Sequence, residues 1–254
     1  MNQLSITHFP ALDYACDEAM NTLCTNLSYS GPGIRTVLFT SRYEQEGKSS
    51  ITMNVMRTLA GYGKRVLLVD ADLRRSTLAR RYRFNYSQRE AFGLVHYLAG
   101  MCALEEVIYQ TNLPGAYILP AGRDVFNSMQ LLTSPLYGEM MRAIRERFDM
   151  VLVDSPPAGV IVDAVEIAKY CDGALIVVGY NRGRGQDIGV VPANIAKTGC
   201  KVLGAVMNGV NIKSFRNRKY YYRSERYSAY YSRYSKSDNK TDKNTKTGRS
   251  AKRK

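Results

Sequence analysis

The stretch TVLFTSRYEQEGKSS, residues 36–50, decides the fold. Its first six residues form a short apolar run that is typical of a buried parallel strand, and a helix is predicted to begin near its end. Between the two, Gly47, Lys48 and Ser49 form the core of a phosphate-binding loop, in which backbone N–H groups and the positive helix end face the phosphates. Arg42 stands where the full pattern G-x-x-x-x-G-K-[ST] has its first glycine. The position of Gly-Lys-Ser between a strand and a helix still favours a nucleotide site.

Further apolar runs alternate with helical patterns along the chain. Strands are expected at 65–70, 116–122, 149–154, 173–180 and 201–208, and helices at 11–28, 48–62, 136–148 and 187–198. This alternation predicts an α/β fold, a mostly parallel sheet with helices on both faces. In such sheets, ligands bind at the carboxyl ends of the strands. The candidate positions therefore follow the strand ends at Ser41, Asp70, Asp154 and Tyr180.

Three carboxylates stand at these strand ends. Asp70 and Asp72 belong to the sequence DADLR, and Asp154 opens the sequence DSPP. An aspartate after a hydrophobic strand commonly holds nucleotide-bound Mg²⁺, directly or through water. Each of the three alone is equally compatible with a helix cap or a turn. Their shared location at the edge that carries Gly-Lys-Ser predicts a metal–phosphate site.

The charge of the chain is unevenly distributed. The 254 residues carry a net charge of +14, but residues 213–254 hold 15 basic and 3 acidic residues, or +12, which leaves +2 for residues 1–212. We expect a folded domain over 1–212 and a flexible basic tail over 213–254. A nearly neutral domain does not imply a nucleic-acid partner.

The cysteine and hydropathy patterns indicate the cellular compartment of the chain. The five cysteines are widely spaced without a C-x-x-C pair, and only two histidines occur, which argues against a zinc site and for free thiols in a reducing cytosol. Neither an N-terminal signal peptide nor an apolar run of about 18 residues is visible. The chain is therefore expected to be cytoplasmic.

The tail contains a dense tyrosine cluster, YYYRSERYSAYYSRY, at residues 220–234. It has no aliphatic residues larger than alanine to pack against and no regular helical or strand period, so its rings are expected to be exposed. The uses that fit are nucleic-acid stacking, membrane anchoring, protein docking and phosphorylation. Its tyrosines are Tyr220, Tyr221, Tyr222, Tyr227, Tyr230, Tyr231 and Tyr234.

The motifs resemble those of one family. VLLVDADLR (66–74), VLVDSPP (151–157) and EGKSS (46–50) are similar to the second aspartate motif (Walker A′), the Walker B motif and the end of the Walker A loop of bacterial tyrosine kinases, or BY-kinases, in the P-loop NTPase superfamily. The resemblance covers about residues 10–234. It is greatest to the capsule and exopolysaccharide type, in which the kinase is a separate chain and a membrane protein supplies the activating segment.

The resemblance implies an ATP- and Mg²⁺-dependent protein-tyrosine autokinase that phosphorylates its own tyrosine cluster and regulates capsular or exopolysaccharide synthesis and export. ATP phosphates would be held by the backbone of Glu46, Gly47, Lys48, Ser49 and Ser50 and by the Lys48 ammonium. Mg²⁺ would be held by Ser49, Asp70 and Asp154.

Further residues would act on the substrate tyrosine or contact the adenine of ATP. Asp70 or Asp72 would orient or deprotonate the incoming tyrosine, and Lys48 and Asp154 complete the catalytic set. Arg74 would hold the Asp72 loop by ion pairing, which is favoured over the alternative that it acts in catalysis. Asn208 would either contact the adenine or cap the end of its strand.

The family also implies partners: a membrane adaptor of the polysaccharide co-polymerase type that recruits the kinase to the inner face of the plasma membrane, further copies of the chain, and a tyrosine phosphatase. Family members often carry Glu-x-x-Arg-x-x-Arg in the first helix for ring assembly, whereas this chain has Glu18, Asn21 and Cys24. Glu44 and Gln45 replace the usual Pro-Gly of the phosphate loop.

Two alternatives remain open from the sequence. One is a P-loop ATPase switch of the cell-division and partition type, which usually has a lysine where Tyr43 stands. The other is a pseudokinase or binding protein whose basic aromatic tail grips RNA or anionic lipid.

Overall fold

The computed structural model describes residues 2–88, 91–181 and 189–210. The predicted tail at 213–254, with its seven clustered tyrosines, lies outside the described residues. Within those residues, no helix has both the length and the apolar character to cross a bilayer.

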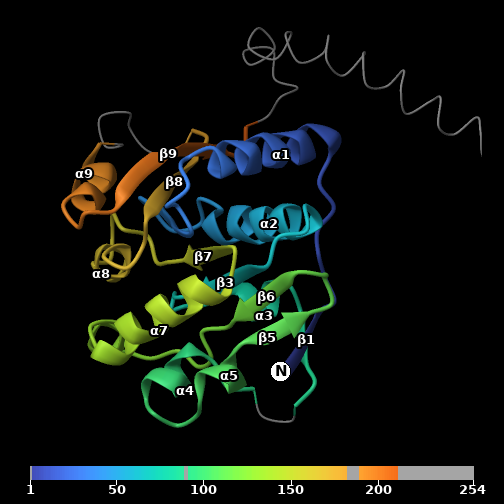
Figure 1. Cartoon of the computed structure of the whole chain (residues 1–254). Helices are drawn as coiled ribbons and strands as arrows, with labels where there is room; N and C mark the ends of the chain where they lie inside the picture. The colour runs from blue at the N-terminus through green and yellow to red at the C-terminus, as the bar shows by residue number, and fades with distance from the viewer. Residues whose placement is uncertain (1, 89–90, 182–188, 211–254) are drawn as a thin grey trace, which may run out of the picture. The chain divides into compact units, whose positions relative to one another are not determined.

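A mixed, mostly parallel sheet forms the centre of the described domain (Figure 1). Its nine described strands follow the order β4-β1-β5-β6-β3-β7-β2-β8-β9, and only the β1–β4 and β5–β6 pairs are antiparallel. The strands are β1 Asn2–Ile6, β2 Thr36–Ser41, β3 Val66–Asp70, β4 Phe84–Tyr86, β5 Tyr109–Thr111, β6 Ala116–Leu119, β7 Met150–Asp154, β8 Gly173–Gly179 and β9 Lys201–Asn208. The predicted α/β fold class is confirmed.

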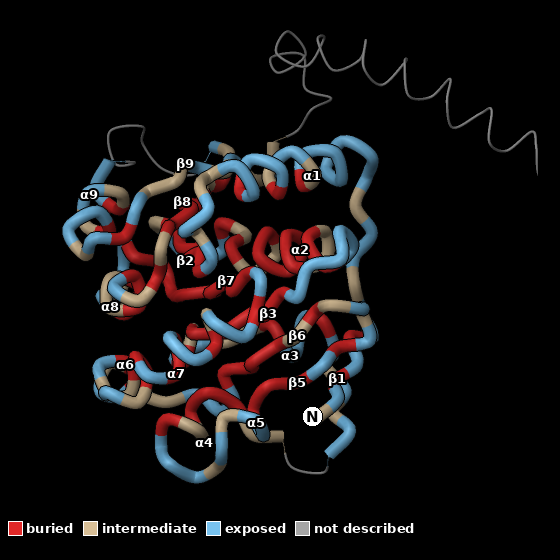
Figure 2. Tube along the Cα trace, viewed as in Figure 1, coloured by how far each residue is buried: buried red, intermediate tan, exposed pale blue. Residues whose placement is uncertain are grey.

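Helices cover both faces of the sheet. The helices are α1 Tyr14–Ser28, α2 Lys48–Gly61, α3 Leu78–Arg81, α4 Leu94–Leu98, α5 Leu104–Val107, α6 Ser128–Leu132, α7 Pro135–Arg147, α8 Asp163–Ala168 and α9 Val190–Ala196. Along β2, Val37 and Phe39 pack with α1 and α2, whereas Leu38 packs with the apolar cluster under α4, α7, α8 and α9. This alternation is the two-residue period of a strand buried on both faces. Figure 2 shows the central strands buried along their length.

Most predicted elements lie where the sequence placed them, and the differences have local causes. The first helix begins at Tyr14 rather than at 11, because the Asp13 carboxylate caps it by accepting the Cys16 N–H at 2.8 Å. The strand predicted to reach 122 ends at Leu119, since Pro120 has no N–H and its carbonyl instead accepts the Leu94 N–H at 2.8 Å. Part of the predicted helix 187–198 lies outside the described residues.

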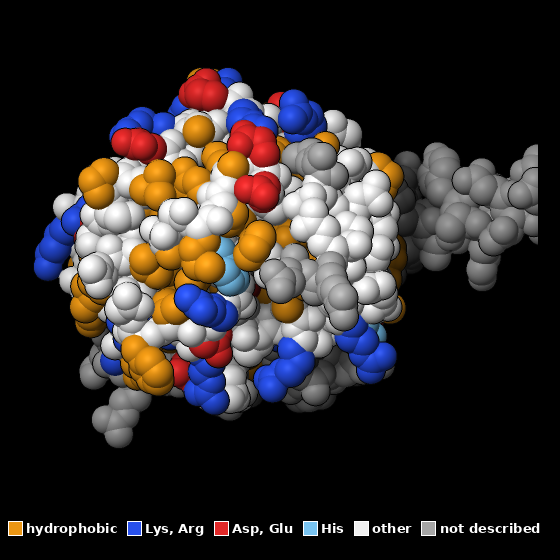
Figure 3. All heavy atoms as spheres, turned by 90° about the horizontal axis from the view of Figure 1, so that it is seen from below, with side chains coloured by type: hydrophobic (Ala, Val, Ile, Leu, Met, Phe, Trp, Pro, Cys, Tyr) orange, Lys and Arg blue, Asp and Glu red, His pale blue; other side chains and the backbone are white. Residues whose placement is uncertain are grey.

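The surface of the domain has mixed charge. On the face shown in Figure 3, basic and acidic side chains lie among apolar and uncharged ones, without a broad area of one sign. This agrees with the net charge of only +2 for residues 1–212.

Candidate active site

The carboxyl ends of β3, β7, β2 and β8 meet at one edge of the sheet, which brings the predicted motifs together. Asp70 at the end of β3 and Asp154 at the end of β7 are direct register partners. The Ala71 N–H donates to the Asp154 carbonyl at 2.8 Å, so the pairing continues just beyond Asp70. Two carboxylates predicted from separate motifs therefore lie side by side.

The phosphate loop connects β2 to α2. Gly47 has φ +92°, in the left-handed region that favours glycine. A Cβ added there would lie 1.9 Å from Asn208 Nδ2, so a side chain at this position would have to displace the Asn208 amide. Gln45 has φ +60°, in the conformation that the usual glycine at that position adopts freely.

Glu46 braces this loop with its side chain. Its Oε2 accepts the Tyr43 N–H at 2.9 Å and its Oε1 accepts the Gly179 N–H at 3.1 Å, and the residue is 3% exposed. The carboxylate thus ties the loop to itself and to the end of β8. The predicted phosphate contact of Glu46 concerns its backbone N–H and stays a prediction.

Asn208, at the end of β9, also reaches the loop. Its Nδ2 donates to the Glu46 carbonyl at 2.9 Å. The Asn208 side chain therefore contacts the backbone of the phosphate loop at the end of its strand. The alternative role, a contact with adenine, stays a prediction.

Lys48 lies close to the acidic groups. The residue is only 8% exposed. Its positive charge opposes the rise that burial produces in the pKa of both Asp72 and Asp154. An ammonium group held between carboxylates at a helix start is suited to neutralising phosphate charge.

Burial strongly raises the pKa of both register partners, Asp70 and Asp154. Asp70 and Asp154 are each 2% exposed. Burial raises the pKa of Asp154 to about 6, against the opposing effects of Lys48 and a hydrogen bond from Ser49. Burial, followed by the charge of Asp154, raises the pKa of Asp70 well above its ordinary value. The pair is therefore poorly accommodated as two bare anions.

This arrangement fits a magnesium–nucleotide complex. Oδ1 of Asp70 and Oδ1 of Asp154 are buried without a hydrogen-bond partner among the described residues. Carboxylate and hydroxyl oxygens are hard donors that suit Mg²⁺, which is usually held by one or two carboxylates together with substrate phosphates. Among the described residues, no group of three or more His, Cys, Asp or Glu that could hold a metal is found.

The loop after β3 is held at several points. Asp72 Oδ1 accepts the Arg75 N–H at 3.1 Å, and the Ser76 hydroxyl donates to Asp70 Oδ2. Asp72 is half-buried, so it is more accessible than Asp70. The sequence did not reveal Ser76 as a partner of Asp70, because serine after such a motif is common in turns.

A buried aspartate anchors the same loop from outside. The Asp163 side chain is 1% exposed and accepts Arg74 Nε at 2.9 Å and Arg74 Nη2 at 3.1 Å. The Ser128 hydroxyl donates to it at 2.6 Å. Burial alone would raise the pKa of Asp163, but these hydrogen bonds lower it below its ordinary value. The ion-pairing role predicted for Arg74 is seen, whereas its partner was missed because it lies 89 residues away.

Comparison with known proteins finds similar sequences and similar folds. The AAA domain family matches residues 45–181. Tyrosine-protein kinase CpsD of Streptococcus agalactiae serotype III (strain NEM316) is 33% identical over 195 residues, which cover 77% of this chain and 83% of that protein. The VpsO kinase domain superposes with a TM-score of 0.70 at 26% identity, covering 78% of this chain and 95% of that one. The septum site-determining protein MinD of Pyrococcus horikoshii OT3, complexed with Mg-ADP, superposes with a TM-score of 0.59 at 25% identity, covering 68% and 70%.

Proposed function

The chain belongs to the bacterial tyrosine kinases of the P-loop class, and we propose that its substrates are the tyrosines of its own C-terminal cluster. The observation that supports phosphoryl transfer at this site is the buried pair Asp70 and Asp154 beside Lys48 at the start of α2, and the seven clustered tyrosines of residues 220–234 are the proposed acceptors. The orphaned oxygens and raised pKa values of the two aspartates suit a bound cation, and the adjacent loop suits phosphates.

When bound, Mg-ATP supplies the phosphoryl group and neutralises the charge that develops on it. Backbone N–H groups of 46–50 and the Lys48 ammonium would hold the phosphates. Ser49, Asp70 and Asp154 would hold the cation.

Asp72 is the better candidate to accept the tyrosine proton. Asp70 is 2% exposed, whereas Asp72 is half-buried and stands where a substrate arriving from solvent meets the site. Burial raises the pKa of Asp72, although Lys48 opposes this, and a carboxylate with a raised pKa is the stronger base. Arg74, held by Asp163, fixes the loop on which Asp72 stands.

Intact-mass spectrometry after incubation with Mg-ATP tests the autokinase. The wild type is expected to gain one phosphoryl mass per modified tyrosine. Lys48→Met and Asp70→Asn are expected to gain none while keeping the native circular dichroism spectrum. A variant with all seven cluster tyrosines changed to phenylalanine is the matched control, because it leaves the site intact but removes the acceptors. Phosphate gain by either site variant at the wild-type rate would disprove the assigned site.

The ATPase-switch alternative predicts a different outcome in the same experiment. A switch of that type would hydrolyse ATP in the wild type and in the seven-phenylalanine variant alike, without any gain in mass. The kinase assignment has the stronger support, because the CpsD relative matches over 77% of this chain. A pseudokinase would show neither activity.

A membrane adaptor of the polysaccharide co-polymerase type is proposed to recruit the chain to the inner face of the membrane and to activate it for capsular or exopolysaccharide synthesis. A non-glycine residue at φ +60° in the phosphate loop, Gln45, is a feature that a binding partner can stabilise. The test compares autophosphorylation rates with and without the adaptor's cytoplasmic segment. Full activity of the chain alone would rule out this regulation.

Self-association is proposed to bring the tyrosines of one copy to the site of another, and a tyrosine phosphatase would reverse the modification. The usual arginine contacts of α1 are not available for it. Cys24 is fully buried against α2, and the Asn21 side-chain oxygen accepts the Tyr62 hydroxyl at 2.9 Å. Sedimentation velocity of the wild type beside the seven-phenylalanine variant tests whether the cluster contributes to assembly. The contact expected to weaken as negative charge accumulates is the docking of a cluster tyrosine at the acidic site of Asp70, Asp72 and Asp154.

A further inference from the structure

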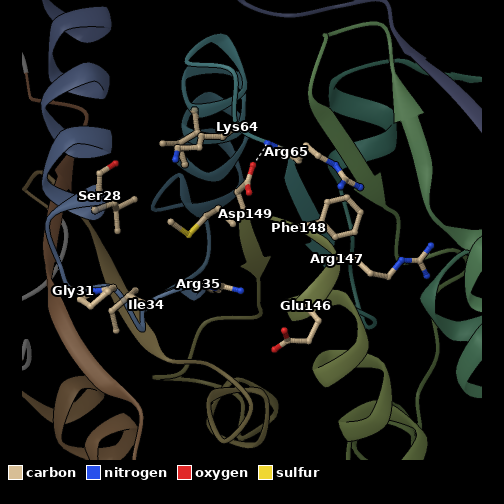
Figure 4. Close-up of a pocket in the computed structure, with 14 residues that line it drawn as sticks. Ser28, Gly31, Ile34, Arg35, Lys64, Arg65, Glu146, Arg147, Phe148 and Asp149 are labelled. Atoms are coloured by element: carbon tan, nitrogen blue, oxygen red, sulfur yellow. Dashed lines mark hydrogen bonds between the residues drawn. The ribbon is translucent and has the colours of Figure 1, made fainter.

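A cavity of about 410 Å³ opens at the amino ends of the central strands, at the sheet edge opposite the candidate active site (Figure 4). Its walls come from the segments that precede β2, β3 and β7 and from the end of α1. We call it the amino-edge cavity; the wall residues that matter here are Leu27, Ile34, Arg35, Lys64, Arg65 and Phe148.

The cavity carries uncompensated positive charge. Arg35, Lys64 and Arg65 are exposed, and the ion pairs found among the described residues include none of them. The Asp149 carboxylate, in the cavity wall, already accepts one hydrogen bond, from the Arg65 backbone N–H at 2.8 Å. The other acidic wall residue, Glu146, pairs with a neighbouring arginine of α7. A fourth wall cation, Arg147, pairs with Glu105, so three cations without an ion pair in the described part of the chain share the wall with one carboxylate that is already hydrogen-bonded.

The same cavity has an apolar side. Leu27 and Phe148, at 2% and 3% exposed, lie beneath the cavity and offer a ligand little surface, whereas the half-buried Ile34 is the part of this apolar wall that a ligand can reach. The Arg65 guanidinium lies over the Phe148 ring at 5.5 Å. Figure 4 shows Lys64 and Arg35 on either side of Asp149. A ligand that joins an anionic head to a flat apolar body matches both parts.

We propose that the amino-edge cavity binds a phosphotyrosine side chain presented by a second copy of this chain. The inference rests on the proposed autokinase, which would make such a ligand. Charge complementarity supports this occupant: residues 220–234 hold three arginines and one glutamate, so the unmodified segment is cationic and is repelled by the cavity. Each phosphate adds roughly −1.5 to −2 charges, so a few reverse the sign. Lys64 and Arg35 would contact the phosphate, and the apolar wall would contact the ring.

Fluorescence anisotropy with synthetic peptides tests the cavity without any need for kinase activity. The probe is a labelled peptide of residues 220–234 phosphorylated at Tyr230 and Tyr231, compared with its unphosphorylated form and with inorganic phosphate as competitor. The full chain should bind the phosphopeptide at least about tenfold more tightly than the unmodified peptide, since hydrogen bonds to charged groups are worth about that factor. Lys64→Glu and Arg35→Glu should each weaken binding by about tenfold or more.

Matched variants locate the site. Arg142→Glu makes the same charge change at an exposed position of α7 outside the cavity wall and should bind like the wild type. Lys48→Met should also bind normally, because it alters only the nucleotide site. If Arg35→Glu fails to fold, Lys64→Gln, at an exposed turn, gives the same comparison.

Each of the following results would overturn the proposal. They are equal binding of both peptides, unchanged binding by the Lys64 variants, and loss of binding in Lys48→Met, which would place the phosphopeptide at the active site. Inorganic phosphate that binds as tightly as the phosphopeptide would also overturn it, since the tyrosine ring would then contribute nothing. Failure of autophosphorylation in the mass experiment leaves these peptide results unaffected, so the two proposals fail separately.

Discussion

Removing one charge from the Asp70–Asp154 pair is expected to stabilise the nucleotide- and metal-free protein while abolishing its kinase activity. Asp154 is 2% exposed and its Oδ1 lacks a hydrogen-bond partner among the described residues. Its pKa rises from 3.8 to about 6 in the folded protein. At about 1.4 kcal/mol per unit, ionised Asp154 costs about 3 kcal/mol of folding free energy at neutral pH. Asparagine has a similar shape and carries no charge, so Asp154→Asn removes this penalty.

The pH dependence has a definite sign. Below the unfolded pKa near 3.8, Asp154 is protonated in both states and imposes no penalty. As the pH rises toward the folded pKa of about 6, the unfolded state releases the proton first, and the stability of the wild type falls. The advantage of Asp154→Asn should therefore grow between about pH 4 and pH 6 and stay constant above.

Thermal unfolding in EDTA measures the effect. A gain of about 3 kcal/mol corresponds to a rise in Tm of roughly 6–12 °C for a chain of this size. Added Mg-ADP should reverse the order, because only the wild type keeps the full cation site. The control is Asp172→Asn. The wild-type Asp172 carboxylate accepts the backbone N–H groups of Arg35 and Thr36 at 2.9 and 2.8 Å, so this variant should lose about 1–3 kcal/mol of folding free energy. A lower Tm for Asp154→Asn in EDTA at neutral pH would refute the reasoning, since Asp154 would then be satisfied without a cation.

Three further substitutions probe separate features. Asp163→Asn removes the charge that anchors Arg74, so steady-state kinetics should show kcat reduced about tenfold or more with the KM for ATP within about twofold, and a normal kcat would exclude a positioning role. Because the Arg74 side chain is 39% exposed and water can solvate it, urea unfolding should show a loss of about 1–3 kcal/mol. Gly47→Ala places a Cβ against the Asn208 amide and strains the left-handed backbone of the loop, so the affinity for ATP, measured by calorimetry, should fall at least about tenfold. An unchanged affinity would show that the loop relaxes freely. Cys24→Arg should lower the free energy of unfolding by several kcal/mol, because it buries a charge at a position with no exposure, and it should not strengthen self-association in sedimentation.

The central strands could be predicted because their sequences contain the necessary information locally. β2, β3 and β7 are continuous apolar runs, as strands buried on both faces require. β1, β4 and β5 were missed for the opposite reason. The strand β1, NQLSI, is short and partly polar, and it is held by pairing of Leu4 with Thr111 and with Tyr86, far along the chain. Short strands of this kind are determined by distant partners rather than by their own pattern.

The candidate site shows the same division. Asp70 and Asp154 could be located from strand ends and Lys48 from the Gly-Lys-Ser sequence that follows β2, since parallel strands bring their carboxyl ends to one edge. The contacts of Glu46 and Asp163 could not, because each depends on a partner in another element: the Gly179 N–H for Glu46 and the Arg74 guanidinium for Asp163. Motif spacing identifies which residues gather, whereas the orientation of the supporting side chains depends on packing.

The Glu46 brace has a consequence for how quickly nucleotide can bind. Because its carboxylate accepts the Tyr43 and Gly179 N–H groups in the protein alone, the loop already has its shape before a phosphate arrives. Nucleotide therefore meets a rigid receptor, and little conformational entropy is lost on association. Stopped-flow measurements should show a single binding phase whose rate rises linearly with nucleotide concentration, without the plateau that a slow isomerisation before capture would impose.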